Sequence, residues 1–290
     1  MTPRDRPEIL QLQQELQTVR LQLAAREQEL GDALQSAANI QRSLIPRTFP
    51  AYHKLHFAWR FAPFKQVGGD LFNIAALDEQ TIMAYLIDVS GHGIASAMVS
   101  VAVHQSLSPT TGRLLKRPLG HRPFYRISSP REVLAALDDE YPFERFEEFF
   151  TITYLLFEPH TGMVRYGNAG HPPPLLLHTD GSLERLDRGG PVIGLNHRDD
   201  NDEGEVQLRE GDRLFLYTDG LVEQTNADGM AFGEGRLVAS LYRQAGHNLE
   251  RTCQEALGSQ RRFAGEVTPQ DDITLIGIEF SNREPSGLAT

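Results

Sequence analysis

Hydrophobic residues recur at a regular spacing along the first part of the chain. Between residues 8 and 45 they occupy the a and d positions of a seven-residue repeat, which predicts one long helix. These positions are Ile9, Leu12, Leu16, Val19, Leu23, Leu30, Ala33, Ala37, Ile40 and Leu44. Arg26 is the only charged interruption, and Pro46 ends the pattern. A narrow seam over about five heptads favours a parallel coiled-coil dimer through residues 8–45; a single amphipathic helix packed on its own domain is the alternative.

Short apolar runs typical of strands follow Pro46. Alternating apolar residues over 55–62 predict a half-buried strand, with the segment 67–78 as its neighbour. The unbroken apolar run 82–87 predicts a strand that is buried on both faces. More strands are expected within 149–195, 212–217 and 271–280, and helices at 92–108, 130–141 and 233–264. Strands with helices grouped in two pairs predict an α+β fold, a layered β-sandwich rather than alternating βαβ units.

This pattern divides the chain into three parts. We expect residues 1–45 to form a coiled-coil linker helix suited to a regulatory role, 46–281 a globular domain and 282–290 a tail. Within the domain, residues 109–130 are a basic, proline-rich connection, expected to be a mobile or inserted loop.

Composition narrows the function classes. A formal net charge of −11 disfavours a nucleic-acid partner, and a single cysteine, Cys253, excludes an intrachain disulfide. No apolar run is long enough to span a membrane and no signal-peptide core follows the N-terminus. We therefore expect a cytoplasmic protein without a membrane or nucleic-acid partner.

Carboxylates stand at the ends of several predicted strands. Asp88 ends the run 82–87, Asp219 follows the run 214–217, and Asp271 and Asp272 precede the last strand. Asp70 follows two glycines. If these strands lie side by side, their acidic ends meet at one edge. Carboxylate oxygens without soft ligands favour magnesium or manganese over zinc.

Five motifs in a fixed order carry a family resemblance. They are VGGDLF at 67–72, DVSGHG at 88–93, NAGHPPPLL at 168–176, YTDGLVE at 217–223 and DDITLI at 271–276, preceded by IQRSLIP at 40–46. Together they resemble the SpoIIE/RsbU-type branch of the metal-dependent type-2C (PPM) serine/threonine protein phosphatases. The resemblance covers residues 40–280 and implies a β-sandwich flanked by helix pairs, with two divalent cations, Mn²⁺ or Mg²⁺, at one end.

The resemblance also implies roles for single residues. Asp88 matches the aspartate that bridges both metals, and Val89 the residue that offers a backbone carbonyl. Asp219 and Asp271 match carboxylates on one metal, and Asp70 matches the residue that holds metal-bound water. Further candidates near the site are Asp272, Gly69, His92 and Lys65, the last at the place of a phosphate-gripping arginine in eukaryotic relatives. His171 is a second loop histidine that can line the site; for His92 and His171 a structural loop role is the alternative.

By resemblance, the expected reaction is hydrolysis of phosphoserine or phosphothreonine by a metal-activated water. The substrate would be a regulatory protein, an anti-sigma-factor antagonist, and the dimeric helix would regulate the site, with an upstream sensor as a separate partner. Two alternatives belong to other classes. One is a catalytically inactive, dimeric scaffold of the same fold. The other is a diguanylate cyclase, whose GGDEF signature VGGDLF resembles, but which gives Asp219 and Asp271 no role.

Overall fold

The computed structural model describes residues 5–46, 54–91, 93–197 and 201–282, with side chains from Leu12 onward in the first range. The chain forms two compact units, Met1–Ser43 and Leu44–Thr290. The expected tail at 282–290 lies outside the described residues except for Asn282.

A single helix makes up the first unit. Helix α1 spans Asp5–Leu44, as the heptad pattern predicts, and ends two residues before Pro46. The seam side chains Leu12, Leu16, Val19, Leu23, Leu30 and Ile40 are between 52 and 66% exposed in the single chain. Arg26 pairs with Glu29 one turn further on, at 2.8 Å. Despite its length α1 is too polar to cross a bilayer, and no other helix within the described ranges is suited to do so.

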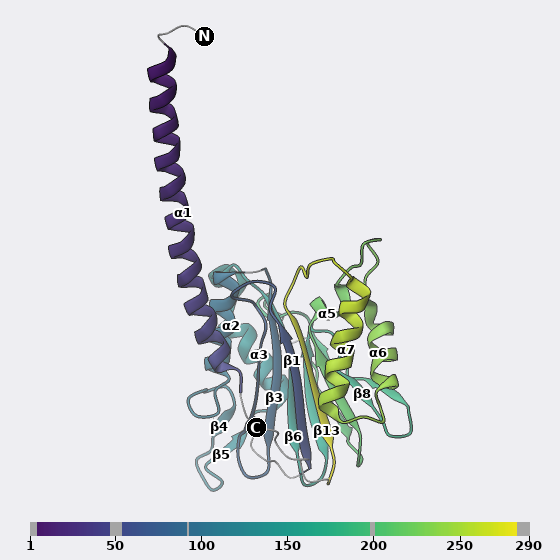
Figure 1. Ribbon diagram of the computed structural model, residues 1–290. Coiled ribbons are helices and arrows are strands. Elements are labelled where there is room, and N and C mark those ends of the chain that lie inside the picture. Colours follow the sequence, from purple (N-terminus) through teal and green to yellow (C-terminus); the bar gives the residue numbers. More distant parts are fainter. Residues whose placement is uncertain (1–4, 47–53, 92, 198–200, 283–290) are drawn as a thin grey trace. The chain divides into compact units, whose positions relative to one another are not determined.

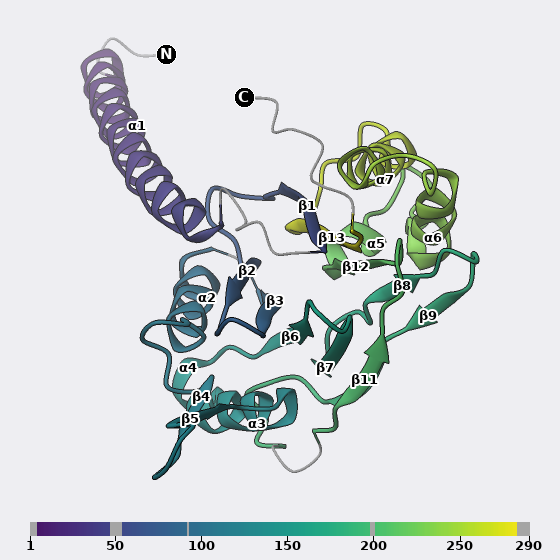
Figure 2. The same ribbon diagram turned by 90° about the horizontal axis from the view of Figure 1, so that it is seen from below.

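Two sheets form the centre of the second unit (Figures 1 and 2). The first has the strand order β1-β13-β12-β8-β9, with β1 (Leu55–Ala62), β13 (Ile273–Phe280), β12 (Arg213–Tyr217), β8 (Leu175–Leu177) and β9 (Leu183–Arg185). The second has the order β10-β7-β6-β3-β2, with β10 (Gly189–Gly190), β7 (Met163–Ala169), β6 (Phe150–Glu158), β3 (Ile82–Val89) and β2 (Leu71–Ala76). Strand β11 (Gly204–Gln207) adds to β7.

Helices cover both outer faces, so the second unit has four layers (Figure 2). Helices α2 (Ile94–Ser106) and α3 (Pro130–Glu140) pack on the second sheet, and α6 (Gly233–Arg243) and α7 (Leu249–Ala264) lie outside the first. Two short helices, α4 (Phe143–Phe146) and α5 (Asp219–Glu223), follow α3 and β12. This is the predicted sandwich flanked by helix pairs.

Alternation along the strands explains the layers. On β12, Leu214 and Leu216 join the core between the sheets, whereas Phe215 and Tyr217 join the cluster under α6 and α7. Successive side chains of a strand point to opposite faces, so a strand covered on both sides is apolar throughout. The same reason makes the run 82–87 fully buried, as predicted.

One expectation from the sequence is wrong, and the structure adds detail to another. Strand β1 does not pair with the segment 67–78: it pairs with β13, and β2 pairs with β3 in the other sheet. The eight residues between β1 and β2 cross from one sheet to the other rather than forming a hairpin turn. The connection 109–130, expected to be a mobile or inserted loop, contains a short hairpin in which β4 (Lys116–Pro118) pairs with β5 (Tyr125–Ile127). The capped start of α3 is confirmed, with Ser129 and Glu132 in a reciprocal capping box.

Candidate functional site

Five aspartates from both sheets come together at one end of the sandwich. Asp70 stands immediately before β2, and Asp88 lies near the end of β3. Asp219 begins α5, with one residue between it and the end of β12, and Asp271 and Asp272 precede β13. The Asp88 carboxyl forms a hydrogen bond with Asp219 and interacts electrostatically with Asp271 and Asp272. Asp70 feels the charges of Asp88 and Asp272. Side chains as far apart in sequence as residues 70 and 272 therefore share one acidic cluster.

Burial and mutual repulsion favour the protonated form of this cluster. Desolvation, followed by the charges of Asp219 and Asp271, raises the pKa of Asp88 to about 8. Desolvation also raises the pKa of Asp70, Asp219 and Asp272, and a neighbouring carboxylate adds to each shift. A buried charge of one sign without a partner is costly. The cluster is therefore a place where a positive counter-charge would be stabilised.

The Asp70 carboxylate is held by two hydroxyl groups that the sequence did not single out. Thr218 Oγ1 donates to Asp70 Oδ2 at 2.9 Å, and Thr274 Oγ1 donates to the same oxygen at 2.5 Å. Thr218 Oγ1 also accepts from the Thr274 backbone N–H. Thr218 directly precedes Asp219, and Thr274 lies two residues after Asp272. The sequence signal for these residues was therefore no more than a hydroxyl group near each acidic motif. They fix Asp70 between the sheets.

Asp272 orients the loop that carries Asp70. Its Oδ1 accepts from the Phe64 backbone N–H at 2.8 Å, and its own N–H donates to Asp271 Oδ1 at 2.8 Å. The Asp70 N–H lies 3.5 Å from Asp272 Oδ2. Asp272 is therefore a bracing residue in this structure, a role that its sequence position left open.

Glycines allow the acidic loops to approach one another closely. A Cβ at Gly69 would lie 2.5 Å from the Val89 carbonyl oxygen, and one at Gly220 would lie 2.2 Å from the Asp272 carbonyl oxygen. A Cβ at Gly68 would overlap the Asp272 carboxylate. Only glycine permits these backbone contacts.

The donor set fits hard divalent cations. It consists of carboxylate oxygens, with the Val89 carbonyl close by, and it carries repulsion that a cation would relieve. In the described part of the chain, no three His, Cys, Asp or Glu side chains are already arranged as a metal cluster. The aspartates thus lie close to one another, but in this structure their carboxylates are not arranged around one common point.

The other sequence candidates lie beside the cluster or outside the described residues. Lys65 is exposed next to Phe64, whose backbone binds Asp272, and its Nζ lies 5.1 Å from the Phe64 ring centroid. Val89 is buried, and its carbonyl faces Gly69. His92 lies outside the described residues.

Two further acidic residues near the cluster were missed. Glu223 lies on α5, one turn after Asp219, and the charges of Asp219 and Asp271 add to desolvation in raising its pKa. Glu148 accepts a hydrogen bond at 2.7 Å from Ser90, which directly follows Val89. Glu223 is the last residue of the motif YTDGLVE but was given no role there, and Glu148 lies outside all of the motifs.

His171 braces the start of β6, next to the acidic cluster. Its Nδ1 lies 2.7 Å from Thr151 Oγ1, and Thr151 is the cross-strand neighbour of Asp88. Asn168 fixes the loop by accepting from the His171 N–H and donating to the His171 carbonyl. Burial lowers the pKa of His171 to about 3, which keeps the ring neutral. This arrangement favours the structural role over a ligand role.

The raised pKa of Asp88 predicts a pH dependence of stability. Between its unfolded value near 4 and its folded value of about 8, the folded protein holds a proton that the unfolded chain lacks. The stabilisation is complete below about pH 4 and is lost as pH rises through 8. Without divalent cations, we expect the free energy of unfolding to fall by on the order of 1–2 kcal/mol from pH 6.5 to 8.5, measured by urea denaturation in EDTA.

Between pH 6.5 and 8.5 the change in stability is expected to come from the carboxylates and not from His171. The folded pKa of His171 lies below its unfolded value, so its contribution is lost only as pH falls below about 6.5. Manganese should remove or reverse the slope. A slope that is absent in EDTA, or unchanged by manganese, would argue against the acidic cluster as the source.

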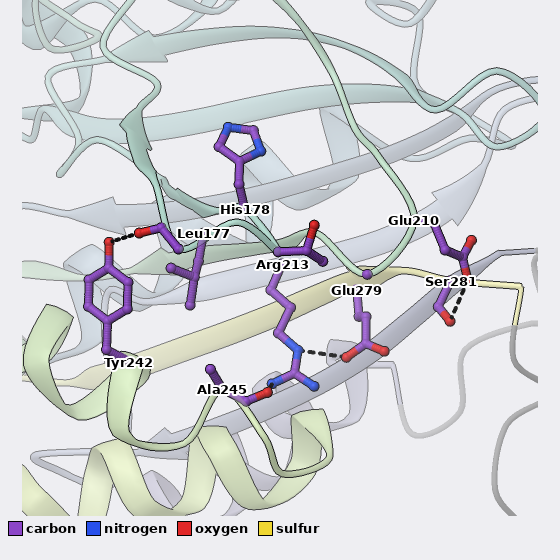
Figure 3. A pocket seen from close by; sticks show the side chains of 11 residues that line it. Leu177, His178, Glu210, Arg213, Tyr242, Ala245, Glu279 and Ser281 are labelled. Atoms are coloured by element: carbon purple, nitrogen blue, oxygen red, sulfur yellow. Dashed lines mark hydrogen bonds and ion pairs between the residues drawn. The ribbon is translucent and has the colours of Figure 1, made fainter.

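A separate pocket lies at the opposite end of the first sheet (Figure 3). It has a volume of about 350 Å³ and is lined by the starting end of β12 and the finishing end of β13, whose other ends lead to the acidic cluster. Arg213 within it donates to Glu279 at 2.7 Å and to the His247 carbonyl at 2.7 Å. Because its guanidinium is occupied by these partners, we assign no chemistry to this pocket.

Comparisons with known proteins agree with this fold. Residues 78–281 match the family model described as Stage II sporulation protein E (SpoIIE). Phosphoserine phosphatase RsbP of Bacillus subtilis is 30% identical over 165 residues, 55% of this chain and 38% of RsbP. The chain thus spans well under two thirds of this relative.

Solved structures show the same architecture. The SiaA-PP2C domain of Pseudomonas aeruginosa superposes with a TM-score of 0.72 at 21% identity, over 89% of this chain and 100% of that domain. The catalytic domain of the serine/threonine phosphatase PstP, solved with two manganese ions, superposes with a TM-score of 0.51 at 17% identity, over 78% of this chain and 98% of that domain. The sandwich with its acidic end thus has the fold of PP2C-type phosphatase domains. The chain belongs to the SpoIIE family.

Proposed function

We propose that this protein is a metal-dependent serine/threonine protein phosphatase. The observation that carries the proposal is the cluster of five aspartates, drawn from both sheets and subject to mutual repulsion. Membership of the SpoIIE family and the similarity to RsbP support the same activity. Two divalent cations, Mn²⁺ or Mg²⁺, would activate water and offset charge on the phosphoryl group when bound.

Each residue of the cluster has a proposed task. Asp88, Asp219, Asp271 and the Val89 carbonyl would hold the cations, with Asp70 oriented beside them by its two threonine partners. A separate group of neighbours would shape the site: Gly69 through its close approach to Val89, Asp272 by bracing the loop, and Lys65 by attracting the substrate phosphate. His92 stays a candidate by its place in DVSGHG alone.

The proposed substrate is a phosphoserine or phosphothreonine on a regulatory protein, an anti-sigma-factor antagonist. RsbP, a phosphoserine phosphatase, supports this class, and the cation-dependent site suits a phosphate monoester. We further propose that the protein acts in the cytoplasm and receives its signal from a separate upstream sensor protein.

Phosphate release from p-nitrophenyl phosphate and from a phosphoserine peptide tests the activity. We expect turnover with manganese or magnesium and its loss with EDTA, restored by adding manganese in excess. Absence of turnover with either substrate at any cation concentration would support the alternative, an inactive dimeric scaffold. Turnover that survives EDTA would rule out the role of the cations.

The exposed seam of α1 supports regulation through a dimer. Six of its apolar seam side chains, from Leu12 to Ile40, lie at heptad spacing and are more than half exposed in the single chain. A second copy of α1 would bury them, and its geometry would pass a signal to the phosphatase unit. We therefore propose a homodimer through residues 8–45.

Replacing Leu16 and Leu23 together by glutamate should disperse this dimer. Four carboxylates would enter the seam of each pair, and we expect the mass in multi-angle light scattering to fall by half. The matched control replaces Gln14 and Gln17 by glutamate, off the seam of the same helix. A mass that is unchanged in the leucine variant would refute the coiled coil.

A further inference from the structure

The hairpin β4–β5 is exposed and has an anchored base. Leu115 is fully buried at its base, and its carbonyl accepts from the Ser128 N–H at 2.9 Å. At the tip, the Leu119 N–H donates to the Phe124 carbonyl at 2.7 Å. Beyond this base, residues 117–126 are exposed except for the half-buried Leu119. Figure 2 shows the hairpin beside α3, on the opposite side of the sandwich from α6 and α7.

This hairpin carries concentrated positive charge on an acidic protein. Residues 109–128 hold five of the chain's 28 Lys and Arg side chains and none of its 39 Asp and Glu. Arg113 pairs with Glu140 and Arg126 with Glu132. Within the described ranges, the remaining three cations, Lys116, Arg117 and Arg122, form no ion pair with a carboxylate.

Two aromatic rings share the surface with these cations. Phe124 is 65% exposed and Tyr125 38%. The Arg122 guanidinium lies 5.8 Å from the Phe124 ring centroid and Lys116 Nζ 4.7 Å from that of Tyr125. Such contacts are weakly attractive at exposed sites and favour the cations lying beside the rings. Arginine and aromatic side chains together are the composition of protein interface hot spots.

We propose that the β4–β5 hairpin is a docking surface for an acidic segment of another protein. Arg117 and Arg122 would bind its carboxylates, and Phe124 would contact an apolar side chain among them. Arg126 already shows this chemistry on the hairpin, since its guanidinium grips both oxygens of Glu132 at 2.6 Å. Docking there goes beyond the proposed phosphatase activity and does not depend on it.

Charge and composition disfavour other polyanions. Three unpaired cations fall short of the clusters of about four to eight that bind anionic lipid surfaces. A nucleic acid carries charge along its whole length and would extend beyond the hairpin onto a chain with a net charge of −11, whereas a short acidic segment contacts the hairpin alone.

A fluorescein-labelled 14-residue peptide of alternating Asp-Glu pairs and leucines serves as the probe, measured by fluorescence anisotropy against the full chain. We expect saturable binding that weakens with salt, and an affinity about tenfold or more lower in the double variant Arg117→Glu/Arg122→Glu. Phe124→Ser should weaken binding without changing its salt dependence. The matched control, Arg243→Glu/Arg251→Glu, makes the same charge change on exposed arginines of α6 and α7 and should bind as the wild type does.

Three results would overturn the proposal. One is equal binding of a peptide in which Asn and Gln replace the acidic residues. Another is unchanged affinity in the hairpin variant, whose thermal midpoint shows that it is folded. The third is tighter binding to vesicles with 30% phosphatidylserine or to a 20-base-pair DNA duplex than to the peptide, which would assign the surface to a lipid or nucleic-acid partner instead.

Discussion

Replacing Asp88 by asparagine is expected to lower kcat/KM for phosphate release by about a thousandfold or more and to stabilise the cation-free protein. Asp88 contacts Asp219 and feels Asp271, so the change would remove a cation ligand from the centre of the cluster. The same change removes a buried acid whose pKa is raised to about 8, so at pH 8 the repulsion among its neighbours falls. We expect on the order of 1 kcal/mol of added stability in EDTA, seen as a higher thermal midpoint.

A loss of activity together with a gain in stability would distinguish a functional aspartate from a buried aspartate that only supports the fold. Asp219→Asn should behave in the same way. The control is Asp228→Asn, the same chemical change at an exposed turn, which should leave both quantities unaltered. Retained activity in Asp88→Asn would contradict the assignment, and a large loss of stability would show that Asp88 supports the fold instead.

Gly220→Ala is expected to cause the second large effect. The new Cβ would lie 2.2 Å from the Asp272 carbonyl oxygen and 3.2 Å from the Asp271 Cβ, so α5 and the start of β13 must move apart. We expect a loss of about 2–3 kcal/mol in the free energy of unfolding and at least about a hundredfold in kcat/KM. Urea denaturation and phosphate release measure the two effects.

Gly235 provides the matched control. It lies within α6, and a Cβ there would meet no atom within 4 Å. Gly235→Ala should stabilise the protein by up to about 1 kcal/mol, because alanine favours a helix more than glycine does, and should leave activity intact. If Gly220→Ala behaves like Gly235→Ala, the close packing of the acidic loops is not required.

Local patterns predicted most of the elements and the acidic motifs. The heptad seam predicted α1, the unbroken run 82–87 predicted β3, and Ser129 before Pro130 predicted the start of α3. Each follows from a periodicity or a cap within a few residues of sequence. Asp88, Asp219 and Asp271 were found because each stands at the end of a predicted strand, where a buried charge needs a partner, and Asp70 because it follows two glycines.

The pairing of strands that are far apart in the sequence was harder to predict from the sequence. The pairing of β1 with β13 joins segments more than 200 residues apart, and nothing in either segment specifies its partner. The hydroxyls of Thr218 and Thr274 gain their meaning only where the two sheets meet at Asp70. The hairpin at 109–130 was hidden because its strands are three residues long and rich in arginine and proline.

Isothermal titration of manganese into the metal-free protein, for the wild type and for Asp219→Asn, tests most directly whether the gathered aspartates hold catalytic cations. We expect binding of two manganese ions per wild-type chain, with release of protons at pH 7, and loss of at least one ion in the variant. No binding at millimolar manganese, or equal binding by both proteins, would contradict this expectation.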